Sequence, residues 1–229
     1  HIASLNKDID LINLLVRDGA NLVAKNALGK TPLHNVALGG QIEILRIFLE
    51  RRPNLEVQDN EGNTPLHIAI LNDNVESVKY LIGAGADVNV KNNAGEAAWQ
   101  GAARNDDLTL IKYLVEERNL DIGDIFDAVK KGYLGIVRYL VEESNINLKI
   151  KNELGSTPLH IASWYGDLKI AKYLVDKGAS LKRKDHAGNT LMHAATWNAH
   201  LELVKYFVLM KVPGLKLKDN AGNTPLHIA

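Results

Sequence analysis

The chain has 229 residues, and its 27 basic and 27 acidic side chains give a formal net charge of zero at pH 7. This balance argues against general binding to nucleic acids or anionic membranes, because both partners require a basic surface. There is no cysteine, which excludes disulfide bonds and thiolate metal sites. No stretch reaches the roughly 18 apolar residues of a membrane-spanning helix, so we expect no membrane insertion and a cytoplasmic protein.

One short motif recurs along the whole chain. Residues 62–69, Gly-Asn-Thr-Pro-Leu-His-Ile-Ala, return unchanged as residues 222–229. Shorter versions begin at Thr31, Thr157 and Thr190, and the steps between copies are 33 or 34 residues, except for the gap of 93 between Thr64 and Thr157. A fixed period of this length is typical of a repeat protein.

The residues around the motif predict a unit of turn, helix, helix and loop. Gly62 suits the turn, because glycine adopts positive φ angles without steric cost. We expect Thr64 to cap a helix that begins at Pro65, where the missing N–H of proline costs nothing. The apolar residues expected to face inward from this helix and the next are Leu66, Ala69, Ile70, Val75, Val78, Leu81 and Ile82.

The Thr-Pro-Leu-His-x-Ala motif at this spacing resembles the ankyrin repeat, and the resemblance covers essentially the whole chain. It implies an all-α repeat solenoid of stacked helix-turn-helix units with β-hairpin or turn loops. We expect a single solenoid over residues 1–229, in which each repeat buries its apolar face on its neighbours. Its expected repeats are residues 1–25 (partial), 26–58, 59–91, 92–120, 121–151 (short and without a hairpin), 152–184, 185–218 and 219–229 (partial).

Two repeats depart from the pattern. In the first, partial repeat we expect a second helix through Leu11, Ile12, Leu14 and Leu15. In repeat 92–120 the motif is replaced by Ala-Ala-Trp-Gln, and we expect Trp99 to lie in the core where other repeats have leucine. Because both ends of the chain fall inside a motif, we also expect it to be part of a longer array.

A regularly spaced series of tyrosines locates the short repeat. Tyrosines 80, 113, 139, 173 and 206 lie within the expected second helices at steps of 33, 26, 34 and 33 residues. The step of 26 leaves no room for a hairpin, and Asp124 is the expected cap of the helix that follows. We therefore expect a gap in the row of hairpins near residue 123, with a bend and a boundary between two binding halves.

The histidines do not suggest a catalytic or metal site. The resemblance implies that those in the motif hydrogen-bond to the backbone of the neighbouring repeat: His1, His34, His67, His160, His193 and His227. His200 matches a structural position, whereas His186 at a hairpin tip has no such explanation. No histidine pair has zinc-helix spacing, and neither a Gly-x-Ser-x-Gly motif nor a phosphate-binding glycine loop occurs. We predict no enzyme activity, no metal and no cofactor.

The resemblance implies a concave face made of hairpin tips and the exposed side of each first helix. Two positions near the end of that helix vary from repeat to repeat. The first position is occupied by Leu5, Leu38, Leu71, Arg104, Lys130, Trp164 and Trp197. The second position is occupied by Asn6, Gly39, Asn72, Asn105, Lys131, Tyr165 and Asn198.

This series predicts a partner-binding surface with an aromatic end. Trp164 and Trp197 are one repeat apart, so we expect them to be neighbours; the alternative is that both rings pack onto the adjacent repeat. Trp, Tyr and Arg dominate the energetics of protein interfaces. The candidate partner-binding residues are Trp164, Trp197, Tyr165, Lys130, Lys131, Arg104, Leu71, Leu38, Asn198 and His186.

We therefore predict a non-catalytic scaffold that binds a peptide or protein with apolar and acidic residues. One alternative is a small-ligand or nucleotide site formed by Trp164, Trp197, Lys130 and Lys131. A cage for methylated lysine, known in the family, ranks lower because its tryptophans occupy a different repeat position. Another alternative is the targeting arm of an enzyme, channel, toxin or effector whose active part lies outside this stretch. The sequence makes no case for a homo-oligomer.

Overall fold

The computed structural model describes residues 8–118 and 120–229, so the predictions for His1, Leu5 and Asn6 lie outside the described residues. The described chain is built from helices and contains no strand; the nearest approach to a sheet is a single antiparallel bridge between Lys91 and Ala97. The chain divides into two compact units, His1–Ala102 and Ala103–Ala229, called unit 1 and unit 2 below. The all-α repeat fold is thus confirmed, and the single solenoid with the listed repeat limits remains a proposal.

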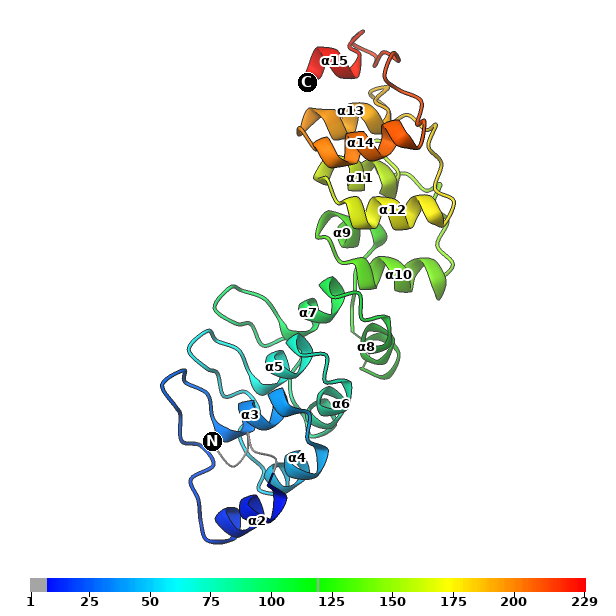
Figure 1. The fold of residues 1–229 in the computed structure, drawn as a ribbon. Coiled ribbons are helices and arrows are strands. Elements are labelled where there is room, and N and C mark those ends of the chain that lie inside the picture. Colours follow the sequence, from blue (N-terminus) through cyan, green and yellow to red (C-terminus); the bar gives the residue numbers. More distant parts are fainter. Residues whose placement is uncertain (1–7, 119) are drawn as a thin grey trace. The chain divides into compact units, whose positions relative to one another are not determined.

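Helices alternate with loops in both units (Figure 1). Unit 1 contains α2 (Ile9–Arg17), α3 (Pro32–Gly39), α4 (Ile42–Leu49), α5 (Pro65–Leu71) and α6 (Val75–Gly83). Helix α7 (Ala98–Arg104) spans the division between the units. Unit 2 contains α8 (Leu108–Lys112), a π-helical segment (Tyr113–Glu117), α9 (Ile125–Lys130), α10 (Leu134–Glu142), α11 (Pro158–Tyr165), α12 (Leu168–Asp176), α13 (Leu191–Trp197), α14 (Leu201–Leu209) and α15 (Pro225–Ile228).

The motif builds a capping box at the start of α3, α5, α11, α13 and α15. In α5, Thr64 is the N-cap and Pro65 the first helical residue, as expected. Nδ1 of His67 lies 2.9 Å from Oγ1 of Thr64 and accepts the Thr64 N–H at 3.2 Å. Because Nδ1 is an acceptor, the proton lies on Nε2, which donates to the carbonyl of Glu96 at 3.1 Å. The motif histidine therefore joins one repeat to the hairpin of the next.

The hairpins are joined to one another by a second set of bonds. In unit 1 the backbone N–H of Asn60 donates to Leu28 at 3.1 Å, and the N–H of Asn93 donates to Glu61 at 3.0 Å. Gly62 has φ of +77°, and a Cβ there would lie 2.5 Å from the backbone nitrogen of Asn93. Glycine is thus required at this position both by the turn and by the close approach of the next hairpin.

The short repeat in unit 2 begins as predicted. Asp124 caps α9, and its carboxylate accepts the N–H of Asp127 at 2.8 Å. Helix α9 packs against both α10 and α11, so the repeat stacks through its helices.

Two expectations about the core are only partly met. In α2, Ile12 and Val16 are buried, but Leu11, Leu14 and Leu15 are exposed, because the helix turns only one narrow face inward. Trp99 is half-buried, whereas Leu66 and Leu159 at the matching motif position are buried, since an indole is larger than the leucine that it replaces. No helix in the described part of the chain is both long and apolar enough to cross a membrane.

A candidate partner-binding groove

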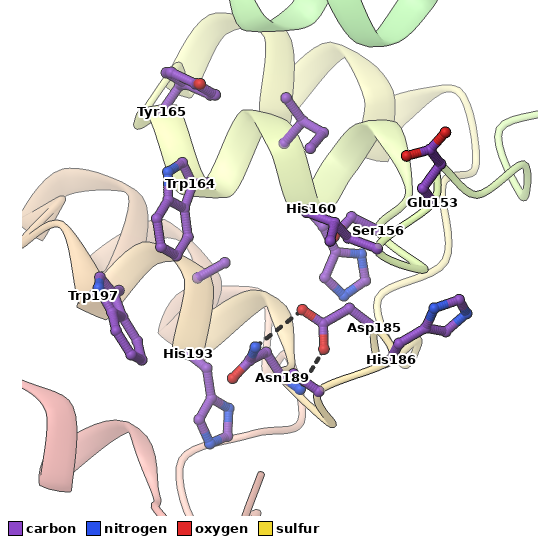
Figure 2. A pocket seen from close by; sticks show the side chains of 14 residues that line it. Glu153, Ser156, His160, Trp164, Tyr165, Asp185, His186, Asn189, His193 and Trp197 are labelled. Atoms are coloured by element: carbon purple, nitrogen blue, oxygen red, sulfur yellow. Dashed lines mark hydrogen bonds between the residues drawn. The ribbon is translucent and has the colours of Figure 1, made fainter. Parts of the chain in front are cut away.

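Unit 2 contains a groove of about 570 Å³ along helices α11 and α13 and the hairpins that precede them (Figure 2). Both helices line the groove with residues at equivalent positions, because they are the first helices of successive repeats. The groove is lined by Glu153, Leu154, Ser156, His160, Ile161, Trp164, Tyr165, Asp185, His186, Ala187, Asn189, His193, Ala194 and Trp197.

The two tryptophans form one side of the groove. Trp164 and Trp197 lie at the ends of α11 and α13, and their ring centroids are 5.9 Å apart with planes tilted by 31°. Their predicted proximity is confirmed. The side chains remain 40% and 53% exposed, so the rings touch each other without being buried in the core.

The backbone beneath these rings is fixed by inter-repeat hydrogen bonds. The carbonyl of Trp164 accepts Nδ2 of Asn198 at 2.8 Å and Nε2 of His200 at 2.9 Å. Helix α11 then ends at Gly166, which has φ of +73°. The ring of Trp164 is therefore presented from a rigid main chain while its own surface stays free for contact.

The floor and rim of the groove have different characters. Ala194 is buried and Ile161 half-buried, and each lies one helical turn before a tryptophan, on the same face of its helix. The charged rim residues are acids: Glu153 is exposed, whereas both carboxylate oxygens of Asp185 accept hydrogen bonds from Asn189, at 2.8 and 3.0 Å. Glu153 is thus the carboxylate that remains open to a partner.

His160 differs from the other buried motif histidines in the hydrogen bonding of its Nε2 atom. Its Nδ1 accepts the Thr157 N–H at 3.3 Å, so Nε2 carries the proton. His34 and His193 donate from Nε2 to the next hairpin, at 3.0 Å each. Nε2 of His160 is buried and lies near the backbone of Asn189, but it forms no hydrogen bond of normal geometry with the described residues. Burial lowers the pKa of His160, which keeps the ring neutral.

The structure gathers some of the predicted site residues and leaves others apart. Tyr165 and His186 line the groove with the two tryptophans, and Asn198 contacts Trp164 through the backbone. Lys130 and Lys131 lie at the end of α9 and are not among the lining residues; Lys131 pairs with Asp127 at 2.7 Å.

Three further predicted residues are exposed elsewhere. Arg104 ends α7, and Leu38 and Leu71 lie near the ends of α3 and α5 in unit 1. They occupy the repeat position of the tryptophans, as predicted, but they do not line the groove.

Sequence reasoning missed Ile161, Ala194 and Asp185. A signal was present for the first two, since they precede Trp164 and Trp197 by three residues and therefore share their helix face. In the part of the chain that the structure describes, no three His, Asp or Glu side chains are grouped so that they could hold a metal ion.

The sequence matches known family models over most of its length. A model described as ankyrin repeats in three copies matches residues 1–92 and 99–185. A second model, described as ankyrin repeats in many copies, matches residues 165–208, which include Trp197.

Proposed function

Because the chain belongs to the ankyrin-repeat family, whose repeats are generally protein–protein interaction modules, we propose that it binds a protein partner through the groove of unit 2 without catalysing a reaction. The observation that carries this proposal is the pair of exposed, adjacent rings of Trp164 and Trp197 beside an apolar floor. Each such ring can bury about 150–250 Å² against a partner.

The rigid backbone supports this role. Association costs entropy for every group that must be ordered, and a surface that is already fixed avoids much of that cost. The main chain at Trp164 is held by Asn198 and His200 before any partner arrives. We propose that an apolar side chain of an extended peptide segment docks in the space that the two indole rings border on one side and Ile161 on the other.

A nucleotide or other small-ligand site is the second candidate. It is favoured by the paired indole rings, on which a base could stack. It is weakened by the rim, which offers the carboxylate of Glu153 to a phosphate, and by the position of Lys130 and Lys131 outside the lining residues. A role as the targeting arm of a larger protein is compatible with either site.

The test is an affinity capture from cell extract with two matched double variants. Trp164→Ala/Trp197→Ala removes the rings of unit 2, and Leu38→Ala/Leu71→Ala removes the exposed side chains at the same repeat position in unit 1. We expect the tryptophan variant to lose the main partner, at least tenfold by quantitative mass spectrometry, and the leucine variant to retain it. Circular dichroism establishes that both variants are folded.

The reverse result, a partner lost only in the leucine variant, would move the binding surface to unit 1. An unchanged partner list in both variants would show that neither the tryptophan pair nor the leucine pair carries the binding, which would overturn the proposal. A third variant, Lys130→Ala/Lys131→Ala, tests the nucleotide site: loss of nucleotide binding in this variant would support that site, and unchanged peptide binding is expected for the groove, which the two lysines do not line.

A further inference from the structure

The three loops that precede the hairpins of unit 2 concentrate positive charge. Residues 147–151, 180–184 and 214–218 contain seven Lys and Arg and no Asp or Glu. The matching segments of unit 1, residues 21–25, 54–58 and 87–91, contain two lysines and two acids. A chain with zero net charge thus carries a local excess of cations, and we call the seven residues the basic stripe: Lys149, Lys151, Lys182, Arg183, Lys184, Lys216 and Lys218.

The stripe is continuous from loop to loop. Nζ of Lys151 donates to the backbone carbonyl of Lys184 at 3.3 Å, and Nζ of Lys184 donates to that of Lys218 at 2.9 Å. The three loops therefore contact one another along unit 2, where Figure 1 shows them following in order. Two lysines are used to hold the loops together, which leaves the others free to meet a partner.

A local turn presents the free cations outward. The side chain of Asn147 accepts the N–H of Lys149 at 2.9 Å, as that of Asn54 accepts the N–H of Glu56 in unit 1. This asparagine turn occurs in both units, and the side chain that it presents differs. Lys149, Lys182 and Lys216 are all exposed at this position.

No carboxylate neutralises the stripe. None of its seven cations forms an ion pair with any residue for which the structure gives a position. Asp185 and Asp219 follow the loops directly, but their carboxylates accept hydrogen bonds from Asn189 and Asn223 of their own hairpins. The stripe therefore keeps an excess of exposed cations, seven against the two carboxylates that follow its loops.

We propose that the basic stripe binds an acidic segment of a protein partner, at a surface separate from the tryptophan groove. Single-stranded nucleic acids bind where aromatic side chains interleave with cations, and the three segments contain no aromatic residue. Duplex DNA is read by a helix or ribbon in the major groove, whereas the stripe lies on loops. Stable binding to an anionic membrane requires an apolar anchor in addition to a basic patch, and the three segments contain no helix that could supply an apolar face.

An acidic polypeptide fits the remaining features. It needs only a row of accessible cations, and such complementarity steers association and sets specificity more than it adds affinity. We expect weak binding that falls steeply with ionic strength, because every cation of the stripe is solvent-exposed.

The experiment uses the full 229-residue chain and a fluorescein-labelled decaglutamate peptide, followed by fluorescence anisotropy at about 50 and 200 mM NaCl. The stripe variant is Lys149→Glu/Lys182→Glu/Lys216→Glu, whose ammonium groups make no hydrogen bond within the described chain. The charge-matched control is Lys79→Glu/Lys169→Glu/Lys211→Glu, which changes net charge equally at other sites. We expect the stripe variant to bind at least about tenfold more weakly and the control to stay within about twofold of the natural chain.

Equal weakening in both variants would overturn the proposal, since binding would then follow net charge alone. Tighter binding of a labelled oligothymidylate, or of vesicles containing phosphatidylserine, through the same lysines would overturn the assignment to an acidic protein segment. Trp164→Ala/Trp197→Ala should leave decaglutamate binding unchanged, so this proposal and the groove can fail independently. Urea unfolding of each variant establishes that it folds.

Discussion

Helices α5 and α11 show how the two units use one framework for different surfaces. Both begin with a threonine cap and proline, and both bury the motif leucine and histidine. They differ near the carboxyl end, where α5 presents Leu71 and α11 presents Trp164. The loops show the same contrast, since unit 1 has Val23, Glu56 and Asn89 where unit 2 has Lys149, Lys182 and Lys216. Hydrogen-bonded positions are thus shared between the units, and solvent-facing positions distinguish them.

The largest expected effect comes from removing a motif histidine that hydrogen-bonds its repeat to the hairpin of the next. His67→Leu should lower the free energy of unfolding by about 3 kcal/mol, because it removes the capping box, leaves the buried N–H of Thr64 unpaired and removes one of the hydrogen bonds that the carbonyl of Glu96 accepts. His160→Leu should cost about 1 kcal/mol less, since Nε2 of His160 forms no hydrogen bond of normal geometry that the substitution could remove. Urea unfolding measures both variants, and an equal loss would show that the two histidines contribute alike.

The next effect is a pH dependence that both units share. Burial lowers the pKa of His34 in unit 1 and of His160 in unit 2 below the ordinary value of 6.5. The fold keeps these rings neutral, whereas the unfolded chain takes up protons near pH 6.5. Their contribution to stability is therefore complete above that pH and is lost as the pH falls below it.

The size of this loss is bounded by one proton per histidine. Each ring should reduce the free energy of unfolding by up to about 1.4 kcal/mol per pH unit. Urea unfolding at about pH 7.5 and pH 5.5 measures the change, because most carboxylates stay ionised across that range. Stability that is constant, or that rises on acidification, would contradict the expected burial of neutral rings.

The smallest expected effect comes from a substitution that gives a hairpin of unit 2 the asparagine found in the hairpins of unit 1. The side-chain amides of Asn60 and Asn93 donate to the preceding hairpin at 3.0 Å each, and that of Asn220 does so at 2.9 Å. His186 occupies this position but makes no such bond in the described chain. We expect His186→Asn to raise the free energy of unfolding by about 1 kcal/mol, and the reverse change Asn60→His to lower it by a similar amount. Stabilisation by both substitutions, or by neither, would contradict this role of the amide.

The sequence predicted what depends on fixed chemistry at fixed spacing. The threonine caps, the Asp124 cap and the proximity of the two tryptophans follow from residue type and a period of 33, whereas the histidine bonds were implied by the resemblance to the ankyrin repeat. The sequence did not predict the groove floor, the lack of a normal hydrogen bond at Nε2 of His160 or the continuity of the basic stripe. These depend on shifts of a fraction of an ångström between neighbouring hairpins and on side-chain torsions, which periodicity does not determine.

The bonds to the carbonyl of Trp164 have a consequence for how binding specificity can change in evolution. Asn198 and His200 hold the main chain there, and Asn74 holds the carbonyls of Ala37 and Leu38 in the same way in unit 1. Substitutions of Leu38 or Trp164 therefore alter the surface while the anchoring side chains, encoded in the following repeat, stay intact. The residues that contact a partner and the residues that hold the backbone are therefore different. A point mutation at a contact residue can change the partner without a compensating change in the scaffold.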